Sequence, residues 1–397
     1  MSNTREKAFY LIGFPAGHGA IDAGTSALWI IAPAIALSMD LSKTQVGLIF
    51  SVIAIAAGVT HIPAGMVGET RFKKIFLLST LWWVAGAYLV ASLMPGYWLL
   101  LFFLAVASSG AAAWHPIALG TMADHMPNRR AYALGVHFVG GSFMEVLAPI
   151  VAGLLLVYMD WRSVMQIIVI PALIMGVVFL RLRRWIPPSP IGHMSLKDFK
   201  AQARLVRRST SLASLGILGL HNMGLMALWS MTPLYLVEER GISPGGSGVL
   251  FAVMVLSGSL GAVLIGRWID RYNRKTVTLS VLVAGALSPL LILWAPNLPV
   301  LVAGLMVAGF AIMGLVPALI AISLSIVGGR QMVMIGLIMA AGEIIGALGA
   351  VLAGLAGETD LRLSLVLVTA FTVCATLLVA VHPFTSAVQE SEAIEVV

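Results

Sequence analysis

The feature that most constrains this chain is a series of long apolar runs, separated by short breaks that contain charged residues, proline or glycine. A helix needs about 20 apolar residues to cross a bilayer, and the runs have that length. Only 10% of the residues are charged, whereas soluble domains contain about 25%. We therefore expect an all-α membrane protein with twelve transmembrane helices. The runs lie at about 9–39, 44–67, 75–94, 97–123, 131–157, 161–184, 210–237, 246–268, 276–294, 299–327, 331–356 and 362–382.

The basic residues are distributed unevenly over the breaks between these runs. If the N-terminus is cytoplasmic, only 4 of the 24 Lys and Arg residues fall outside, which leaves 20 inside. Cytoplasmic loops of membrane proteins are enriched in Lys and Arg, so we expect both termini to be cytoplasmic in a bacterial plasma (inner) membrane. The net charge of +7 then reflects topology, and no nucleic-acid partner is expected. The outside residues are Lys43, Arg162, Arg240 and Arg362.

The two halves of the chain resemble each other at an offset near 200 residues. Such an internal repeat is typical of secondary transporters, in which six helices pack as one half and six as the other. We expect a six-helix bundle over 1–185, a cytoplasmic linker over 186–209, and a second bundle with a cytoplasmic tail over 210–397. The matching pairs are Asp22 with Asn222, Trp29 with Trp229, Gly65 with Gly266, Glu69 with Asp270, Pro116 with Pro317, and Glu145 with Glu343.

One loop carries a family resemblance. The segment Gly266-Arg-Trp-Ile-Asp270-Arg271-Tyr-Asn-Arg274-Lys275 resembles the cytoplasmic loop motif of the major facilitator superfamily. The first-half copy is degenerate, because Glu69 stands in the acidic position and the following basic residue is missing. The resemblance implies two pseudo-symmetric six-helix halves whose first and fourth helices line a central cavity. It also implies that Gly266, Asp270, Arg271 and Arg274 control the opening of the cytoplasmic side, with a solvated loop as the simpler interpretation.

Three further segments are similar to the fosmidomycin-resistance family of drug exporters. They are His18-x3-Asp22, Ala112-Ala-Trp-His115-Pro116 and the stretch from Gly140-Gly141 to Pro149. This narrower resemblance covers mainly the first half and implies drug export. Ile117 and Ala148 depart from it, which leaves substrate and direction open.

Three acidic residues lie well inside apolar runs, namely Asp22, Glu145 and Glu343. A charged side chain at the bilayer centre costs about 2.5–3.5 kcal/mol on insertion scales, so each should face a protein or water-filled interior. His18 and Asp22 are four residues apart and share one helical face, where an imidazole and a carboxylate can exchange a proton. We expect them to be a proton-coupling pair, with a packing pair as the alternative. Glu145 and Glu343 are further candidates for proton sites or gates, or make interhelical hydrogen bonds.

Aromatic and polar residues on the helices expected to line the cavity are candidates for substrate binding. The methionines are scattered and read as core residues, and we expect no metal site. No Lys or Arg lies deep in a run, which favours a neutral or cationic substrate over a strongly anionic one. The substrate-binding candidates are Trp29, His115, His221, Asn222 and Trp229.

These observations favour a monomeric secondary active transporter that exports a small organic compound by alternating access. The chain has no Gly-Lys pair and therefore no nucleotide-binding P-loop, so we expect a proton gradient as energy source and no cofactor. Uptake of a metabolite or of a soft metal ion is the alternative. A membrane sensor or enzyme is disfavoured, because the chain lacks HExxH and GxSxG motifs and any long extramembrane domain. Its other partners are membrane lipids.

Overall fold

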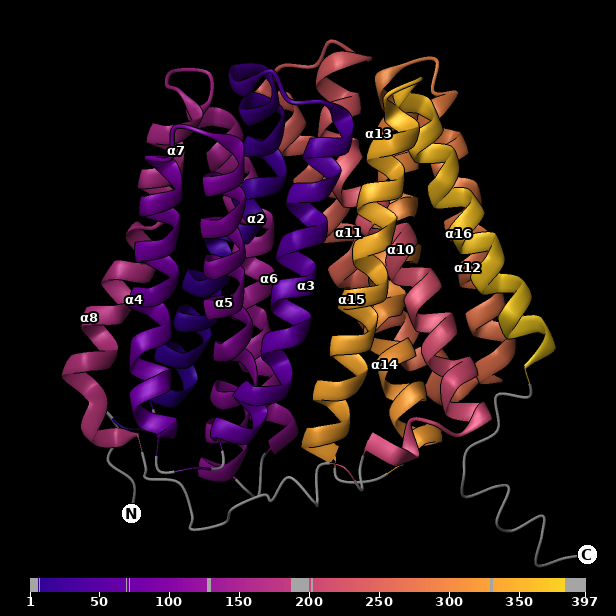
Figure 1. The fold of residues 1–397 in the computed structure, drawn as a ribbon. Helices are drawn as coiled ribbons and strands as arrows, with labels where there is room; N and C mark the ends of the chain where they lie inside the picture. The colour runs from indigo at the N-terminus through magenta and orange to yellow at the C-terminus, as the bar shows by residue number, and fades with distance from the viewer. Residues whose placement is uncertain are drawn as a thin grey trace, which may run out of the picture. The chain divides into compact units, whose positions relative to one another are not determined.

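The computed structural model describes residues 6, 8–68, 70, 72–126, 130–186, 200, 203–328 and 331–382. Within these ranges the chain forms twelve helical segments that are long and apolar enough to cross a membrane (Figure 1). Every segment agrees with a predicted run to within three residues at each end. The predicted all-α architecture is confirmed. Glu69 and most of the predicted linker, including residues 187–199, lie outside the described residues.

The first six spans are built from long helices with one interruption. The first span begins with a π-helical segment, η1, and the sixth is divided near Pro171, which has no N–H to continue the helical ladder. The elements are η1 (Phe9–Gly13), α2 (Phe14–Met39), α3 (Lys43–Gly68), α4 (Lys73–Ser92), α5 (Tyr97–His125), α6 (Arg130–Leu155), α7 (Trp161–Ile168), α8 (Ile170–Leu182) and the 3-10 turn η3 (Arg183–Trp185).

The second six spans follow the same plan with a different interruption. A π-helical segment, η4, lies in the middle of the tenth span. Asn273 and Asn297 cap two of the helices through side chains that accept backbone N–H groups. The elements are α10 (Ser209–Glu238), α11 (Pro244–Arg271), α12 (Arg274–Leu293), α13 (Leu298–Ala308), η4 (Gly309–Met313), α14 (Gly314–Val327), α15 (Gln331–Gly357) and α16 (Leu361–Val381).

The chain divides into two compact units whose boundaries differ from the ends of the predicted bundles. The first unit comprises 1–41, 52–194 and 236–252, and the second comprises 42–51, 195–235 and 253–397. The start of α3 belongs to the second unit because it packs on α15, where the Ser51 hydroxyl donates to the carbonyl of Ala347 over 2.6 Å. The start of α11 belongs to the first unit because it packs on the end of α6.

Glycines allow both of these helix pairs to approach closely, and they do so at equivalent positions of the repeat. A Cβ added at Gly153 of α6 would lie 2.6 Å from the carbonyl oxygen of Pro244. One added at Gly354 of α15 would lie 2.5 Å from that of Lys43. The two glycines are 201 residues apart, and so are Lys43 and Pro244. The repeat read from the sequence is therefore present in the packing. Gly47 against Ala350 and Gly248 against Pro149 show the same correspondence.

A hydrogen bond joins the start of α3 to the residue that follows α15. The backbone N–H of Thr44 donates to the Glu358 carboxylate over 2.8 Å, which caps the first turn of α3. Hydrogen bonds from Ser42 and Thr44 hold the pKa of the Glu358 carboxyl below its ordinary value. Because the pKa is lowered, this contact is present at neutral pH and is lost only as the pH falls through that lowered pKa.

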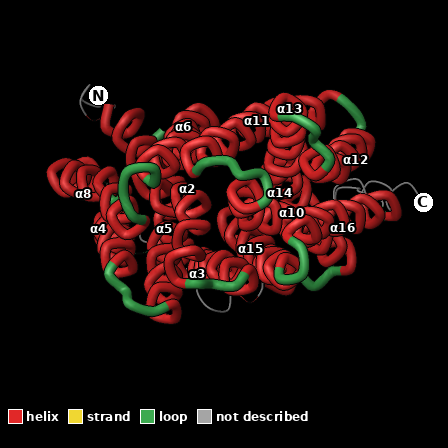
Figure 2. The backbone as a smooth tube through the Cα atoms, turned by 90° about the horizontal axis from the view of Figure 1, so that it is seen from above, coloured by secondary structure: helices red, strands yellow, loops and turns green. Residues whose placement is uncertain are grey.

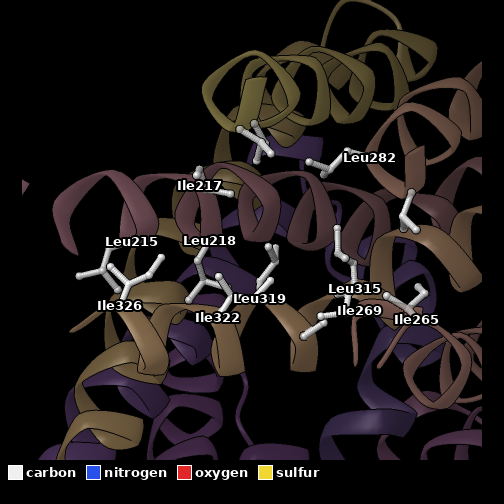
Figure 3. Close-up of a cluster of buried hydrophobic side chains, with 14 of the residues drawn as sticks. Leu215, Ile217, Leu218, Ile265, Ile269, Leu282, Leu315, Leu319, Ile322 and Ile326 are labelled. Carbon is white, nitrogen blue, oxygen red and sulfur yellow. The ribbon is translucent and has the colours of Figure 1, made fainter. Parts of the chain in front are cut away.

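The second unit has a continuous apolar core between α10, α11, α12 and α14 (Figure 3). Leu218 of α10 lies beside Leu319 and Ile322 of α14, and all three are at most 5% exposed. Packing of this kind holds membrane helices together, because lipid removes the hydrophobic drive that acts in water. It fixes α10 and α14 against each other.

In the first unit, α2 is packed by α4, α5, α6 and α8 (Figure 2). The residues of α2 are buried over most of its length, including Ile21, Leu28 and Ile31. A polar side chain in the middle of α2 must therefore meet the side chains and backbone of these neighbouring helices instead of lipid.

Candidate functional site

The predicted pair on α2 is formed. His18 and Asp22 are one helical turn apart, and the His18 Nε2 atom lies 3.1 Å from Asp22 Oδ2. His18 is 5% exposed and Asp22 is half-buried. The four-residue spacing was sufficient to predict this contact, because residues i and i+4 share a face of any α-helix.

A third residue, His115 of α5, joins this pair. Its Nε2 atom lies 3.4 Å from the other carboxylate oxygen of Asp22, so the carboxylate lies between two imidazoles from two helices. The sequence placed His115 among the substrate-binding candidates, but no spacing connected it with Asp22. Neither α2 nor α5 contains Lys or Arg. The cations available to Asp22 from these two helices are therefore protonated histidines.

Helix α6 positions the histidine of the pair. The Nδ1 atom of His18 lies 2.9 Å from the carbonyl oxygen of His137, and the two imidazole rings stack with centroids 4.3 Å apart. Gly141 makes room for this arrangement, since a Cβ there would lie 2.6 Å from the His18 ring. The Gly140-Gly141 pair singled out in the sequence thus serves to bring α6 against α2. The sequence gives no sign that the backbone of His137 takes part in the site.

Two histidines hydrogen-bond to backbone carbonyls that lack an N–H donor because of a proline. Pro116 has no N–H for the carbonyl of Ala112, and His61 of α3 hydrogen-bonds to the Ala112 backbone instead. In the second unit, the carbonyl of Ile312 lies in η4. In a π-helix it would accept a hydrogen bond from the N–H of residue 317, but that residue is also a proline and has no N–H.

His221 of α10 hydrogen-bonds to the carbonyl of Ile312. Its Nε2 atom donates to the Ile312 oxygen over 2.7 Å, and the side chain is 1% exposed. The sequence suggested His221 as a substrate contact. In the structure its ring makes this backbone contact.

The two remaining buried carboxylates have different surroundings. Glu145 of α6 is close enough to interact electrostatically with both Asp22 and His18, so it belongs to the same cluster. Glu343 of α15 is in the second unit, and no hydrogen bond or ion pair to it is found within the described part of the chain. Repeat-equivalent acids therefore have different neighbours.

In the second unit, Asn222 lies against the glycine that is the repeat equivalent of Gly141. A Cβ added at Gly342 of α15 would lie 2.6 Å from the Asn222 Nδ2 atom. Gly342 lies 201 residues after Gly141, so the same glycine position accommodates a histidine in one half and an amide in the other. The titratable cluster is thus present in the first half and replaced by a neutral group in the second. Of the remaining substrate candidates, Trp29 is 5% exposed and Trp229 is half-buried.

The loop motif lies at the junction of α11 and α12. Asp270, Arg271 and Arg274 are exposed, and no ion pair joins them to any residue that the structure describes. Lys275 has a defined role instead, because its Nζ atom donates to the carbonyls of Ala380 and His382 over 2.7 and 3.1 Å. It caps the end of α16, where free carbonyls favour a cation.

Comparison with solved structures gives the fold. The chain superposes on a bacterial homologue of the human lysosomal transporter Spinster with a TM-score of 0.78 and 18% identity, over 95% of this chain and 97% of the other. It superposes on the nucleoside transporter NupG with a TM-score of 0.76 and 14% identity, over 94% and 98%. Both superpositions cover nearly the whole of each chain, so this chain shares its fold with these two proteins.

Three curated relatives are 22–25% identical to this chain. A probable sugar efflux transporter of Helicobacter acinonychis is 22% identical over 266 residues, 66% of this chain and 65% of its own length. A hexuronate transporter of Bacillus subtilis is 25% identical over 65% of this chain and 63% of its own length. A B. subtilis transporter, YfnC, is 24% identical over 81% and 80%.

The family model described as Major Facilitator Superfamily matches residues 16–219 and 214–395, so it covers nearly the whole chain in two copies. With the twelve spans, these matches identify an integral membrane transport protein and not an enzyme. The chain belongs to the major facilitator superfamily.

Proposed function

We propose that this transporter is a proton-coupled antiporter that exports a small organic compound by alternating access, as a monomer in the bacterial plasma membrane. The observation that supports it best is the Asp22 carboxylate held between the Nε2 atoms of His18 and His115. An ionisable cluster inside a membrane-spanning bundle is costly, and its usual use is a proton or ion pathway. The proton gradient would supply the energy, with no cofactor.

Within this cluster, Asp22 is the main proton-coupling carboxylate and His18 assists it. Asp22 contacts both imidazoles, so one proton added to the group changes the charge that helices α2 and α5 share. Its repeat partner Asn222 cannot titrate, which favours coupling in the first half. Glu145 is the secondary candidate because it lies near the same cluster. Glu343 is the alternative in the second half.

The proposed class of substrate rests on the charged residues of the spans. No Lys or Arg lies deep in a span, so a strongly anionic compound would lack a fixed counter-charge. The proposed substrate is therefore neutral or cationic, although one relative is named a hexuronate transporter and another a probable sugar efflux transporter. Trp29, Trp229, His115 and Asn222 are the proposed contacts, and their rings and amide suit a compact polar organic molecule.

The proposal is tested with purified protein in sealed vesicles that contain a pH-sensitive dye. A thermal-shift screen against neutral, cationic and anionic compounds first selects ligands, because a bound ligand raises the melting temperature. Adding a selected ligand outside should then make the lumen more alkaline, since an antiporter moves protons out as substrate enters. Acidification would indicate symport and therefore the uptake alternative. An unchanged luminal pH during substrate entry would contradict proton coupling.

The proposed topology predicts that both termini are protected from outside reagents. The only cysteine, Cys374, is exposed on α16, so Cys374→Ala provides the background for labelling. In intact cells, a membrane-impermeant maleimide should fail to label Thr4→Cys and Glu390→Cys, and should label both after lysis. Thr359→Cys, in the loop between α15 and α16, is the control that should be labelled from outside. Labelling of either terminus in intact cells would reverse the orientation.

The loop motif is proposed to set the balance between inward-open and outward-open states. Asp270→Asn should lower the transport rate about tenfold while changing substrate affinity less than twofold, because coupling energies of this kind are about 1–3 kcal/mol. The matched control is Asp40→Asn, another exposed acid, whose left-handed backbone (φ 51°) also suits asparagine. Equal loss of binding and transport in Asp270→Asn would show a structural role instead.

A further inference from the structure

We infer that His18, Asp22 and His115 form a binding site for one divalent transition-metal ion of the zinc class. Their ligand atoms all lie within 4.8 Å of one another. The sequence analysis predicts no metal site, whereas the fold brings His115 to Asp22 from 93 residues away. This inference goes beyond proton coupling and does not depend on it.

The neighbours of the His18 ring determine which of its nitrogen atoms carries the hydrogen. Its Nδ1 atom faces the carbonyl oxygen of His137, which can only accept a hydrogen bond, so Nδ1 carries the hydrogen. In the neutral ring, Nε2 then carries a lone pair, and this lone pair faces Asp22 Oδ2 at 3.1 Å. Either a proton on Nε2 or a metal ion can bridge this nitrogen and the carboxylate oxygen, and a metal ion can bind His115 at the same time.

The distances suit a metal ion as that bridge. Ligands bound to zinc at about 2.0–2.2 Å with tetrahedral geometry lie about 3.3–3.6 Å from one another. The His115 Nε2 to Asp22 Oδ1 distance is 3.4 Å, within that range and longer than an ordinary N–H···O hydrogen bond of about 2.7–3.2 Å. The two imidazoles face different oxygens of the Asp22 carboxylate, so the side chains must shift from these positions to place one ion among ligand atoms that lie within 4.8 Å of one another.

The surroundings also have the features of a metal site. Metal-binding histidines usually donate their other ring N–H to a carbonyl, as His18 does to His137. Gly141 and the stacked His137 ring hold the His18 ring in place. Asp22 and His115 are half-buried, which leaves a fourth position for water or for a donor atom of a ligand. Glu145 supplies a second nearby carboxylate to balance a double positive charge.

The ligand set selects the class of ion. Two imidazoles and one carboxylate suit Zn²⁺, Co²⁺ or Ni²⁺. Mg²⁺ and Ca²⁺ prefer six or more oxygen ligands, which these three side chains do not offer. We therefore expect zinc-class ions to bind and Mg²⁺ and Ca²⁺ to fail.

The test uses the full chain in detergent, freed of any histidine tag and treated with a chelator. Titration calorimetry with ZnCl₂ should show one ion per chain, and MgCl₂ should show none. Each of His18→Gln, Asp22→Asn and His115→Gln should weaken Zn²⁺ binding about tenfold or more, since losses of this order follow even from changes around a metal site. His125→Gln, a histidine of the same unit that pairs with Glu6 outside the cluster, should bind as the unchanged protein does.

Co²⁺ gives a second measurement that does not depend on affinity. In the unchanged protein it should produce the visible absorption of a four-coordinate ion, and His115→Gln should remove it. Metal-free melting curves identify any variant that fails to fold, and His115→Gln keeps the inference testable because it leaves the α2 pair intact. Binding that survives all three substitutions, or that is lost equally in His125→Gln, would overturn the site.

Discussion

Asp22→Asn should abolish proton movement driven by substrate while substrate exchange across the membrane continues. Asparagine has nearly the shape of a protonated aspartic acid, so the variant imitates one state of the transport cycle permanently. His18 and His115 would lose the carboxylate that lies 3.1 and 3.4 Å from their Nε2 atoms. Without the carboxylate that contacts both imidazoles, the proposed link between proton release and substrate movement is lost.

Two measurements separate the coupled from the uncoupled reaction. Luminal pH in dye-loaded vesicles should stay constant when substrate is added to Asp22→Asn, and labelled substrate should still exchange against unlabelled substrate in a counterflow assay. We expect at least a tenfold loss of net, gradient-driven transport with less than a threefold change in exchange, an effect of about 1.4 kcal/mol or more on the coupled step.

Glu343→Gln is the matched control, because Glu343 is also a buried carboxylate but lies in the second unit. It should keep proton coupling. Glu145→Gln should reduce coupling partly, since Glu145 interacts electrostatically with Asp22 and His18 without contacting them in an ion pair. If Asp22→Asn still moves protons with substrate and Glu343→Gln does not, the coupling residue is on α15 and our assignment is wrong.

The sequence was sufficient for the features that local periodicity controls. Length and hydropathy of a run determine whether it can span a bilayer, so all twelve spans could be predicted. The contact between His18 and Asp22 could be predicted for the same reason, because it needs only one turn of helix. The repeat was visible as pairs of residues about 200 apart, and Gly153 with Gly354 shows that these pairs also share their packing.

The rest of the site depends on contacts between helices. Nothing in a sequence states that His115 meets Asp22, or that the carbonyl of His137 orients His18. One signal could have been used: each of Pro116 and Pro317 leaves a carbonyl without its N–H donor, and a buried histidine on another helix is a suitable replacement. That reasoning would have assigned His61 and His221 to the backbone before the structure did.

Gly140→Ala should destabilise the protein and disrupt the cluster on α2. A Cβ at this position would overlap the carbonyl oxygen of Pro15, and the overlap is with backbone atoms, so no rotamer change can relieve it. The two helices must move apart, and overpacking of this kind costs about 1–3 kcal/mol. Because α6 carries both the carbonyl that orients His18 and the glycine that accommodates its ring, separation of α2 from α6 also moves His18 away from its position beside Asp22.

Gly135→Ala is the matched control in the same helix, since a Cβ at Gly135 meets nothing within 4 Å. Alanine is the better helix former by about 1 kcal/mol, so this variant should be as stable as the unchanged protein or more stable. Melting temperatures of the two variants in detergent measure the difference, and substrate-driven pH change in vesicles measures the effect on coupling. We expect Gly140→Ala to melt several degrees lower and to lose most of its coupled transport, with Gly135→Ala unaffected in both. Equal melting temperatures would show that the close approach of α6 to Pro15 is not needed to hold the cluster.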